Sequence, residues 1–121
     1  ASTFGGGPVV CRAAIAVLRA IQKEKLLHHT MEMGRYLASK LDALKNEGNL
    51  ITGIRGAGLM WGVELRQEGK PVVEECLKRG LLINCTHGTV LRIMPALRVS
   101  KSEIDKAVKI LKRALNKCVS V

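Results

Sequence analysis

The chain has 121 residues, about the length of one domain, and 47% of them are hydrophobic, although only one Phe, one Tyr and one Trp are present. Its 20 Lys and Arg outnumber its 10 Asp and Glu and give a formal net charge of +10. The basic residues are scattered without a long run and aromatic rings are scarce, which argues against a single-stranded nucleic-acid binder and favours a solvated basic surface.

The first expected element is a glycine-rich loop that leads into a helix. Ser2 and Thr3 offer hydroxyl donors, and residues 5–7 are glycines, which let a backbone approach an anion closely. Pro8 suits the first turn of a helix, and apolar residues at helical spacing continue that helix to about Ile21. These features predict a phosphate site at a helix N-terminus, with a flexible leader as the alternative interpretation.

A long second helix is expected over residues 24–46. Its apolar side chains recur every three or four residues on one stripe, and Gly48 is a suitable residue to end it. The stripe consists of Met33, Leu37, Leu41 and Leu44. We therefore expect one face of this helix to be buried.

Two strands are expected next, over residues 50–55 and 59–66, with a glycine-rich corner between them at Gly56 and Gly58. Apolar residues at every second position of the later run give the period of a strand. They are Leu59, Trp61, Val63 and Leu65. Gly62, in the middle of that run, predicts close approach by another backbone or side chain.

Residues 71–80 are expected to form a short helix that opens on proline and ends at glycine. Its inward side chains are expected to be Val72, Val73, Cys76 and Leu77. Residues 81–84 and 90–94 have the pattern of two more strands, joined by a turn through residues 86–88.

The last helix is indicated by Ser100-x-x-Glu103, which has the spacing of a capping box, and apolar residues at helical spacing continue it through Leu115. The element order is then helix, helix, two strands, helix, two strands, helix. That order predicts an α+β fold in which a small, mostly antiparallel sheet is covered by helices.

Neither a metal site nor a membrane segment is expected. The four cysteines form no Cys-x-x-Cys pair, so a structural zinc site is not predicted. His28 and His29 are expected at the surface, and His87 in a loop. Without an apolar run of about 18 residues, we expect a soluble, cytoplasmic protein with reduced thiols and no membrane partner.

Four blocks of the sequence resemble one protein family. They are Ser2-Thr3-Phe4-Gly5-Gly6-x-Pro8, Ile54-Arg55-Gly56-x-Gly58-Leu59-Met60-x-Gly62-Val63-Glu64-Leu65, Gly80-Leu81-Leu82-Ile83-Asn84 and Val90-Leu91-Arg92-Ile93-x-Pro95. In order and spacing, over nearly the whole chain, they resemble the class III aminotransferases, and most closely the carboxy-terminal part of the acetylornithine aminotransferase group. The resemblance implies the C-terminal small domain of a fold-type I transferase that uses pyridoxal phosphate.

By this resemblance, residues 1–22 form a cofactor-phosphate loop and a junction helix to a large domain, and residues 23–121 form the small domain. In the family, the catalytic lysine and the carboxylate that pairs with the pyridine nitrogen lie upstream of the Ser-Thr-Phe-Gly-Gly block. The chain is therefore expected to hold no catalytic residue and to be inactive alone. Gly7 stands where the family usually has asparagine, which removes a side-chain cap from the helix start.

The resemblance also implies binding roles for particular residues. Thr3, and after it Ser2, would donate hydroxyls to a cofactor phosphate held mainly by the other subunit of a homodimer. Arg92 would bind the substrate α-carboxylate through two parallel hydrogen bonds, although the residues alone leave open an ion pair with Glu64. Arg55 is interpreted as structural, either solvated or paired with a carboxylate of the large domain.

The implied reaction of the complete homodimer moves an amino group between N-acetylornithine and 2-oxoglutarate, in arginine synthesis. Ornithine aminotransferases share the turn of residues 86–88, so ornithine is an alternative donor, and other class III ω-aminotransferases are less similar. An alternative of another class is a basic module that binds a polyanion, as the net charge allows. A third is a dimerisation piece whose site has decayed, for which Gly7 is the only hint.

Overall fold

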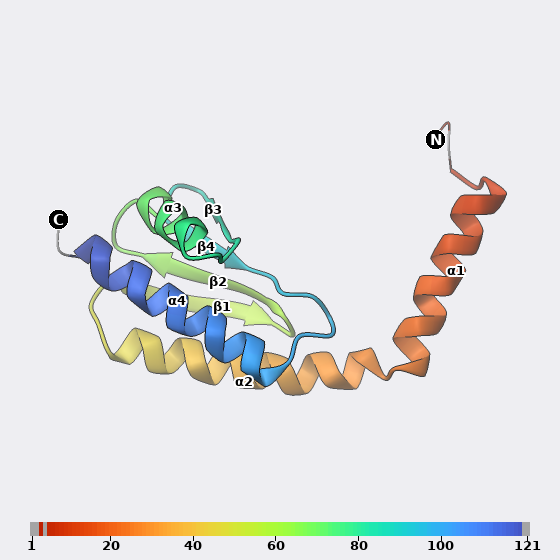
Figure 1. Ribbon diagram of the computed structural model, residues 1–121, viewed down its shortest axis with the longest axis horizontal. Helices are drawn as coiled ribbons and strands as arrows, with labels where there is room; N and C mark the ends of the chain where they lie inside the picture. The colour runs from red at the N-terminus through yellow and green to blue at the C-terminus, as the bar shows by residue number, and fades with distance from the viewer. Residues whose placement is uncertain (1–2, 4, 120–121) are drawn as a thin grey trace.

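The computed structural model describes residue 3 and residues 5–119. The described residues form four helices and one four-stranded sheet (Figure 1). The elements are α1 (Pro8–Lys23), α2 (Leu26–Asn46), β1 (Ile51–Ala57), β2 (Met60–Leu65), α3 (Lys70–Lys78), β3 (Asn84–Thr86), β4 (Val90–Ile93) and α4 (Lys101–Val119). Their order is the predicted one, and the α+β class is confirmed.

The sheet is antiparallel throughout. Its strand order is β1-β2-β4-β3. β1 and β2 form one hairpin, β4 and β3 form another, and α3 carries the chain from β2 to the far edge of the sheet. β2 and β4 are therefore the inner strands.

Helices α2, α3 and α4 cover one face of this sheet with a single aliphatic core. Val63 of β2 and Leu91 of β4 have no exposed surface, and they belong to the same cluster as the predicted stripe of α2. Other fully buried members are Leu41, Val72, Cys76 and Leu111. Each such side chain contributes roughly 1.5–3 kcal/mol through burial, so this face holds the fold together.

No helix formed by the described residues covers the opposite face of the sheet. Met60 of β2 and Met94 after β4 lie on this face, and 57% and 61% of their surfaces are exposed. Because side chains alternate along a strand, these residues point away from the buried Val63 and Leu91. We call this side of the sheet the bare face.

The corner between β1 and β2 is tighter than predicted. β1 continues through Gly56, and Gly58 (φ 53°) and Leu59 make the turn. A Cβ on Gly34 of α2 would lie 2.2 Å from the Gly58 carbonyl oxygen, so α2 can approach this turn only because residue 34 is glycine. Trp61 Nε1 donates a hydrogen bond to the same oxygen at 2.8 Å.

Helix α3 buries Glu75 and exposes Leu77, which the sequence predicts to face inward. Leu77 is 57% exposed, so its predicted inward position is wrong, whereas Glu75 is buried. Lys117 Nζ of α4 lies 3.0 Å from one Glu75 oxygen, and Arg79 Nη2 lies 2.6 Å from the other. Hydrogen bonds from Lys117 and then Arg79 lower the pKa of Glu75, and these two cations make its burial possible.

Strand β3 begins later than predicted. The sequence predicts residues 81–84, but the strand covers residues 84–86. β4 is only four residues long, and its register with β3 ends at the pair Asn84–Arg92, so residues 81–83 have no ladder partner. The Leu81 amide instead donates to the Cys76 carbonyl at 2.9 Å.

Helix α4 begins with the predicted capping box. Ser100 Oγ accepts a hydrogen bond from the Glu103 amide at 3.3 Å, and Glu103 Oε2 accepts one from the Ser100 amide at 2.8 Å. The bond from the Ser100 backbone is the main reason that the pKa of Glu103 is lowered. A signal of two residues in the sequence therefore located the start of this helix.

Helix α1 stands apart from the remainder (Figure 1). None of its residues is buried, and Val9 is 82% exposed. Lys25, at φ 52°, lies between α1 and α2, where the chain changes direction. The division of the chain at residues 22 and 23 stays a prediction.

Candidate functional site

A row of paired residues crosses the bare face from one edge of the sheet to the other. Residues directly opposite each other in an antiparallel sheet point to the same face. Leu91, next to Arg92 in the chain, is fully buried, so Arg92 and its paired residues lie on the bare face. In strand order, the row consists of Arg55, Gly62, Arg92 and Asn84. We call it the arginine row.

A shallow hollow of about 470 Å³ lies over the arginine row. Gly62 lies between the two arginines, and a Cβ there would be 3.2 Å from Val90 Cγ1, a close approach of the kind that the sequence predicts. The absent side chain therefore leaves room between the two guanidinium groups. The lining residues are Arg55, Gly56, Ala57, Met60, Trp61, Gly62, Thr86, Val90 and Arg92.

Arg92 is held by an amide. Its Nε donates a hydrogen bond to Asn84 Oδ1 at 3.1 Å, from the directly paired position on β3. Within residues 3 and 5–119, no carboxylate lies within ion-pair distance of Arg92. The two terminal nitrogens, which form the end of the planar fork, are thus available to an anion.

Arg55 takes the partner that the sequence offers to Arg92. Arg55 Nη1 lies 3.3 Å from Glu64 Oε2. The alternative in which Arg92 pairs with Glu64 is therefore not what the structure shows, and Arg55 is largely exposed but has Glu64 as a partner within the chain. By strand register, Glu64 lies within reach of both arginines. The residues opposite Glu64 on the two neighbouring strands determine with which arginine it pairs.

Thr3 lies in the loop before α1, where it is exposed, whereas Ser2 lies outside the described residues. Gly6 has φ 81°, a conformation that suits glycine. Gly7 is the N-cap residue of α1, no described side chain caps this helix start, and its first turn holds no acidic residue. This is the expected consequence of glycine at position 7.

The loop and the arginine row lie at different ends of the chain. Figure 1 shows α1 running away from the sheet, with its N-terminal end far from β4. Thr3 and Arg92 are therefore not brought into one pocket by this chain alone. Thr3 presents its hydroxyl at the surface of the loop before α1, and Arg92 presents its guanidinium at the surface of the sheet.

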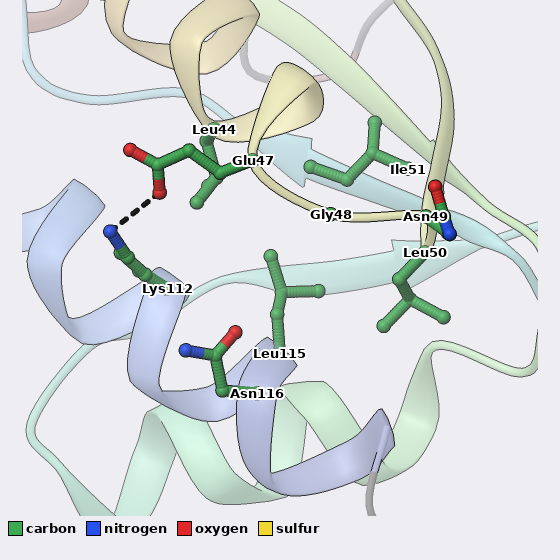
Figure 2. A pocket seen from close by; sticks show the side chains of 9 residues that line it. All are labelled: Leu44, Glu47, Gly48, Asn49, Leu50, Ile51, Lys112, Leu115 and Asn116. Atoms are coloured by element: carbon green, nitrogen blue, oxygen red, sulfur yellow. Dashed lines mark ion pairs between the residues drawn. The ribbon is translucent and has the colours of Figure 1, made fainter.

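A second, larger cavity of about 520 Å³ lies between the end of α2 and the C-terminal half of α4 (Figure 2). Leucine side chains from both helices and from the loop after α2 line it, and Lys112 Nζ is paired with Glu47 Oε2 at 2.5 Å across its rim. No predicted site residue lies here. Its two charged side chains neutralise each other, so the cavity offers no unpaired charge to a ligand.

The remaining candidate residues have ordinary surroundings. His29 Nε2 forms a hydrogen bond of 2.9 Å with the Val99 carbonyl oxygen, His28 pairs with Glu32 on the surface, and His87 lies exposed in its turn. Across the described part of the chain, no group of three or more His, Cys, Asp or Glu could hold a metal ion. No helix there is long and apolar enough to cross a bilayer.

Asn84 is the site residue that sequence reasoning missed. The sequence identifies it only as the end of a strand, because its importance depends on which residue of β4 it faces. A polar amide at a strand end, eight residues before an arginine on the next strand, is a usable signal once the hairpin register is known.

The fold and site together define the class of protein. The described residues combine a small antiparallel sheet with helices on one face, an available arginine on the other face and a glycine-rich loop before a separate helix. The family model described as Aminotransferase class-III matches residues 1–115. The chain belongs to the class III aminotransferase family.

Individual relatives agree with this family. The chain is 44% identical over 114 residues, 94% of its length, to the acetylornithine aminotransferase of Methanosarcina mazei. It is 40% identical over 94% of its length to the ornithine aminotransferase of Bacillus subtilis. It also superimposes, with a TM-score of 0.89 and 30% identity over 97% of its length, on the crystal structure of acetylornithine aminotransferase from Elizabethkingia anophelis.

These relatives are much longer than the chain. It spans 28% of the length of each of the two curated relatives and 30% of the crystal structure's chain. The chain therefore corresponds to less than a third of each of these aminotransferases.

Proposed function

We propose that this chain is the carboxy-terminal part of a pyridoxal-phosphate-dependent enzyme that transfers an amino group between N-acetylornithine and 2-oxoglutarate. Support comes from its similarity to relatives that carry the name acetylornithine aminotransferase, at 44% and 42% identity over 94% of the chain. Relatives named ornithine aminotransferase, at 40% and 41% identity, support ornithine as the alternative donor. The complete enzyme acts in the cytoplasm, in arginine synthesis.

In this proposal, Arg92 binds the α-carboxylate of the substrate. The observation that carries this role is the bonding of its guanidinium: among the described residues, Arg92 bonds Asn84 through Nε at 3.1 Å, and its terminal nitrogens have no carboxylate partner. The end of the fork can then form two parallel hydrogen bonds to a carboxylate, which lysine cannot match. Gly62 and Arg92 both line the shallow hollow on the bare face.

Thr3, with Ser2, binds the cofactor phosphate across a homodimer interface. The described residues fit an anion, because Thr3 is exposed and the start of α1 carries neither a side-chain cap nor an acidic residue. The wide separation of this loop from Arg92 supports contributions to two different active sites, one in each subunit. Each site would then contain Arg92 from one subunit and Thr3 from the other.

The tasks of this chain in the reaction are binding and orientation. When bound, pyridoxal phosphate supplies the electron sink for amino-group transfer. Arg92 fixes the carboxylate end of the substrate, and Thr3 helps to fix the phosphate end of the cofactor. The lysine that moves the proton belongs to the large domain, so the 121-residue chain alone is expected to show no transaminase turnover.

Replacement of Arg92 by Lys in the complete enzyme tests this function. Loss of the two-bond grip removes about 1.5–3 kcal/mol, so KM for 2-oxoglutarate should rise by roughly 10- to 100-fold. Steady-state kinetics with both substrates measure it. The matched control is Arg66→Lys, because Arg66 follows β2, is exposed, and bonds the Asn49 carbonyl oxygen through its side chain at 3.2 Å.

Unchanged kinetics in the Arg92→Lys enzyme would show that Arg92 does not bind a carboxylate. That result would favour the alternative in which the chain is a dimerisation piece with a decayed site. A rise of KM in the Arg66→Lys control as well would show a general effect of losing guanidinium groups instead.

A further inference from the structure

Glu64 is placed symmetrically between the two arginines of the arginine row. It lies two residues beyond Gly62 on β2, and Gly62 is paired with Arg55 on one side and Arg92 on the other. Diagonal neighbours of this kind, on one face of a sheet, are about 7–8 Å apart at Cα, within reach of long side chains. By strand register alone, the Glu64 carboxylate could pair with either guanidinium.

The residues opposite Glu64 break this symmetry. On β1 it faces Gly53, and a Cβ there would be only 3.2 Å from Glu64 Oε2, so the carboxylate occupies the space above this glycine. On β4 it faces Val90, whose methyl groups offer no hydrogen bond. Glu64 therefore leans toward β1, where Arg55 Nη1 meets Oε2 at 3.3 Å.

This choice matters because a carboxylate beside Arg92 would compete with a substrate carboxylate. An internal group already attached to the sheet has a high effective concentration and would occupy the guanidinium for much of the time. Its charge would also repel an approaching anion. Arg55 removes both effects by holding Glu64 on the other side of Gly62.

We propose that Arg55 is a positioning residue that sequesters Glu64 and so keeps Arg92 free for the carboxylate of the substrate. The inference rests on the proposed role of Arg92 and deepens it. Arg55 acts through Glu64 without touching the substrate. Because the side chains of Arg55 and Glu64 are 69% and 42% exposed, their pair adds little to folding stability, and its loss should alter binding more than stability.

The test compares single and double substitutions in the complete enzyme. Arg55→Gln releases Glu64 toward Arg92, so KM for 2-oxoglutarate should rise roughly tenfold with a smaller change in kcat. The double variant Arg55→Gln/Glu64→Gln removes the competing charge and should return KM to within about twofold of the wild type. Arg55→Lys keeps a cation beside Glu64 and should rescue most of the affinity.

An equilibrium measurement separates binding from turnover. Glutarate is a dicarboxylate with neither an amino nor a keto group, and its dissociation constant can be measured by titration calorimetry in each variant. The constant should follow the same order as KM. Arg113→Gln, which removes an exposed arginine of α4 on a distant element, controls for the loss of one positive charge.

Three results would overturn the inference. Arg55→Gln without an effect on KM or on glutarate binding would show that Glu64 does not compete. A double variant as weak as Arg55→Gln would show that Arg55 itself binds substrate or supports the fold. Arg92→Lys is measured in parallel. If it leaves KM unchanged, the proposed function fails, and this inference fails with it. If KM rises in Arg92→Lys but not in Arg55→Gln, only the role of Arg55 is refuted.

Discussion

Leu91 and Arg92 are neighbours in the chain, yet they belong to two regions with different demands. Leu91 points into the core beneath three helices and has no exposed surface, while Arg92 points to the bare face and is exposed. On the covered face, small changes of volume at fully buried side chains are costly because these side chains are closely packed. On the bare face, an open hollow and unpaired donors are what a ligand requires, so its substitutions should affect binding before stability.

The largest effect should follow from Leu91→Ala. The change removes a fully buried side chain and leaves a cavity, which typically costs about 2–5 kcal/mol of unfolding free energy. Urea unfolding of the chain, followed by circular dichroism, measures it. Met94→Ala, on the bare face, is the control and should cost less than about 1 kcal/mol. Equal losses in the two variants would remove the distinction between the faces.

Two glycine substitutions sharpen the same comparison. Gly34→Ala forces α2 away from the β1–β2 turn, because the new Cβ would lie 2.2 Å from a backbone oxygen, and should cost about 1–3 kcal/mol. In Gly62→Ala the closest contact of the new Cβ is a side-chain atom, Val90 Cγ1, at 3.2 Å, so this change should lower stability less. It should raise KM in the complete enzyme, since it fills the floor of the hollow. Gly48→Ala, with open space around it, is the control.

The smallest effect concerns the buried carboxylate of α3. Its neighbouring cations lower the pKa of Glu75 below the ordinary carboxyl value of 4.5. A lowered pKa contributes stability that is complete above 4.5 and is lost as the pH falls through the folded value. The difference in melting temperature between the wild type and Glu75→Gln should therefore be larger at pH 7 than at pH 3. A constant difference across this range would exclude the ion pairs as its source.

Local sequence patterns predicted the covered face better than the bare one. The stripe of α2, the alternation around Val63 and the capping box at Ser100 depend on residues close together in the chain, and the structure confirms them. The start of β3 and the exposure of Leu77 were predicted wrongly. The start of β3 depends on the length of β4, and the inward-facing side of α3 includes Glu75, whose partner Lys117 lies far along the chain in α4.

Prediction of the candidate site required knowledge of contacts between residues on different strands. Arg92 was identified through its resemblance to a family block, and no spacing rule gave its role. The choice of Glu64 between two arginines depends on Gly53 and Val90, which lie on different strands. Strand register decides such contacts, and register emerges only when the whole sheet has assembled.

The separate course of α1 has a practical consequence for purification. The 16-residue helix α1 exposes its valines and leucines to solvent, and such an apolar surface promotes self-association. Dynamic light scattering of the 121-residue chain should therefore show particles that grow with concentration, whereas a shortened chain starting at Glu24 should stay monodisperse. Crystallisation and spectroscopy of the sheet and its covering helices would then be best attempted with the shorter form.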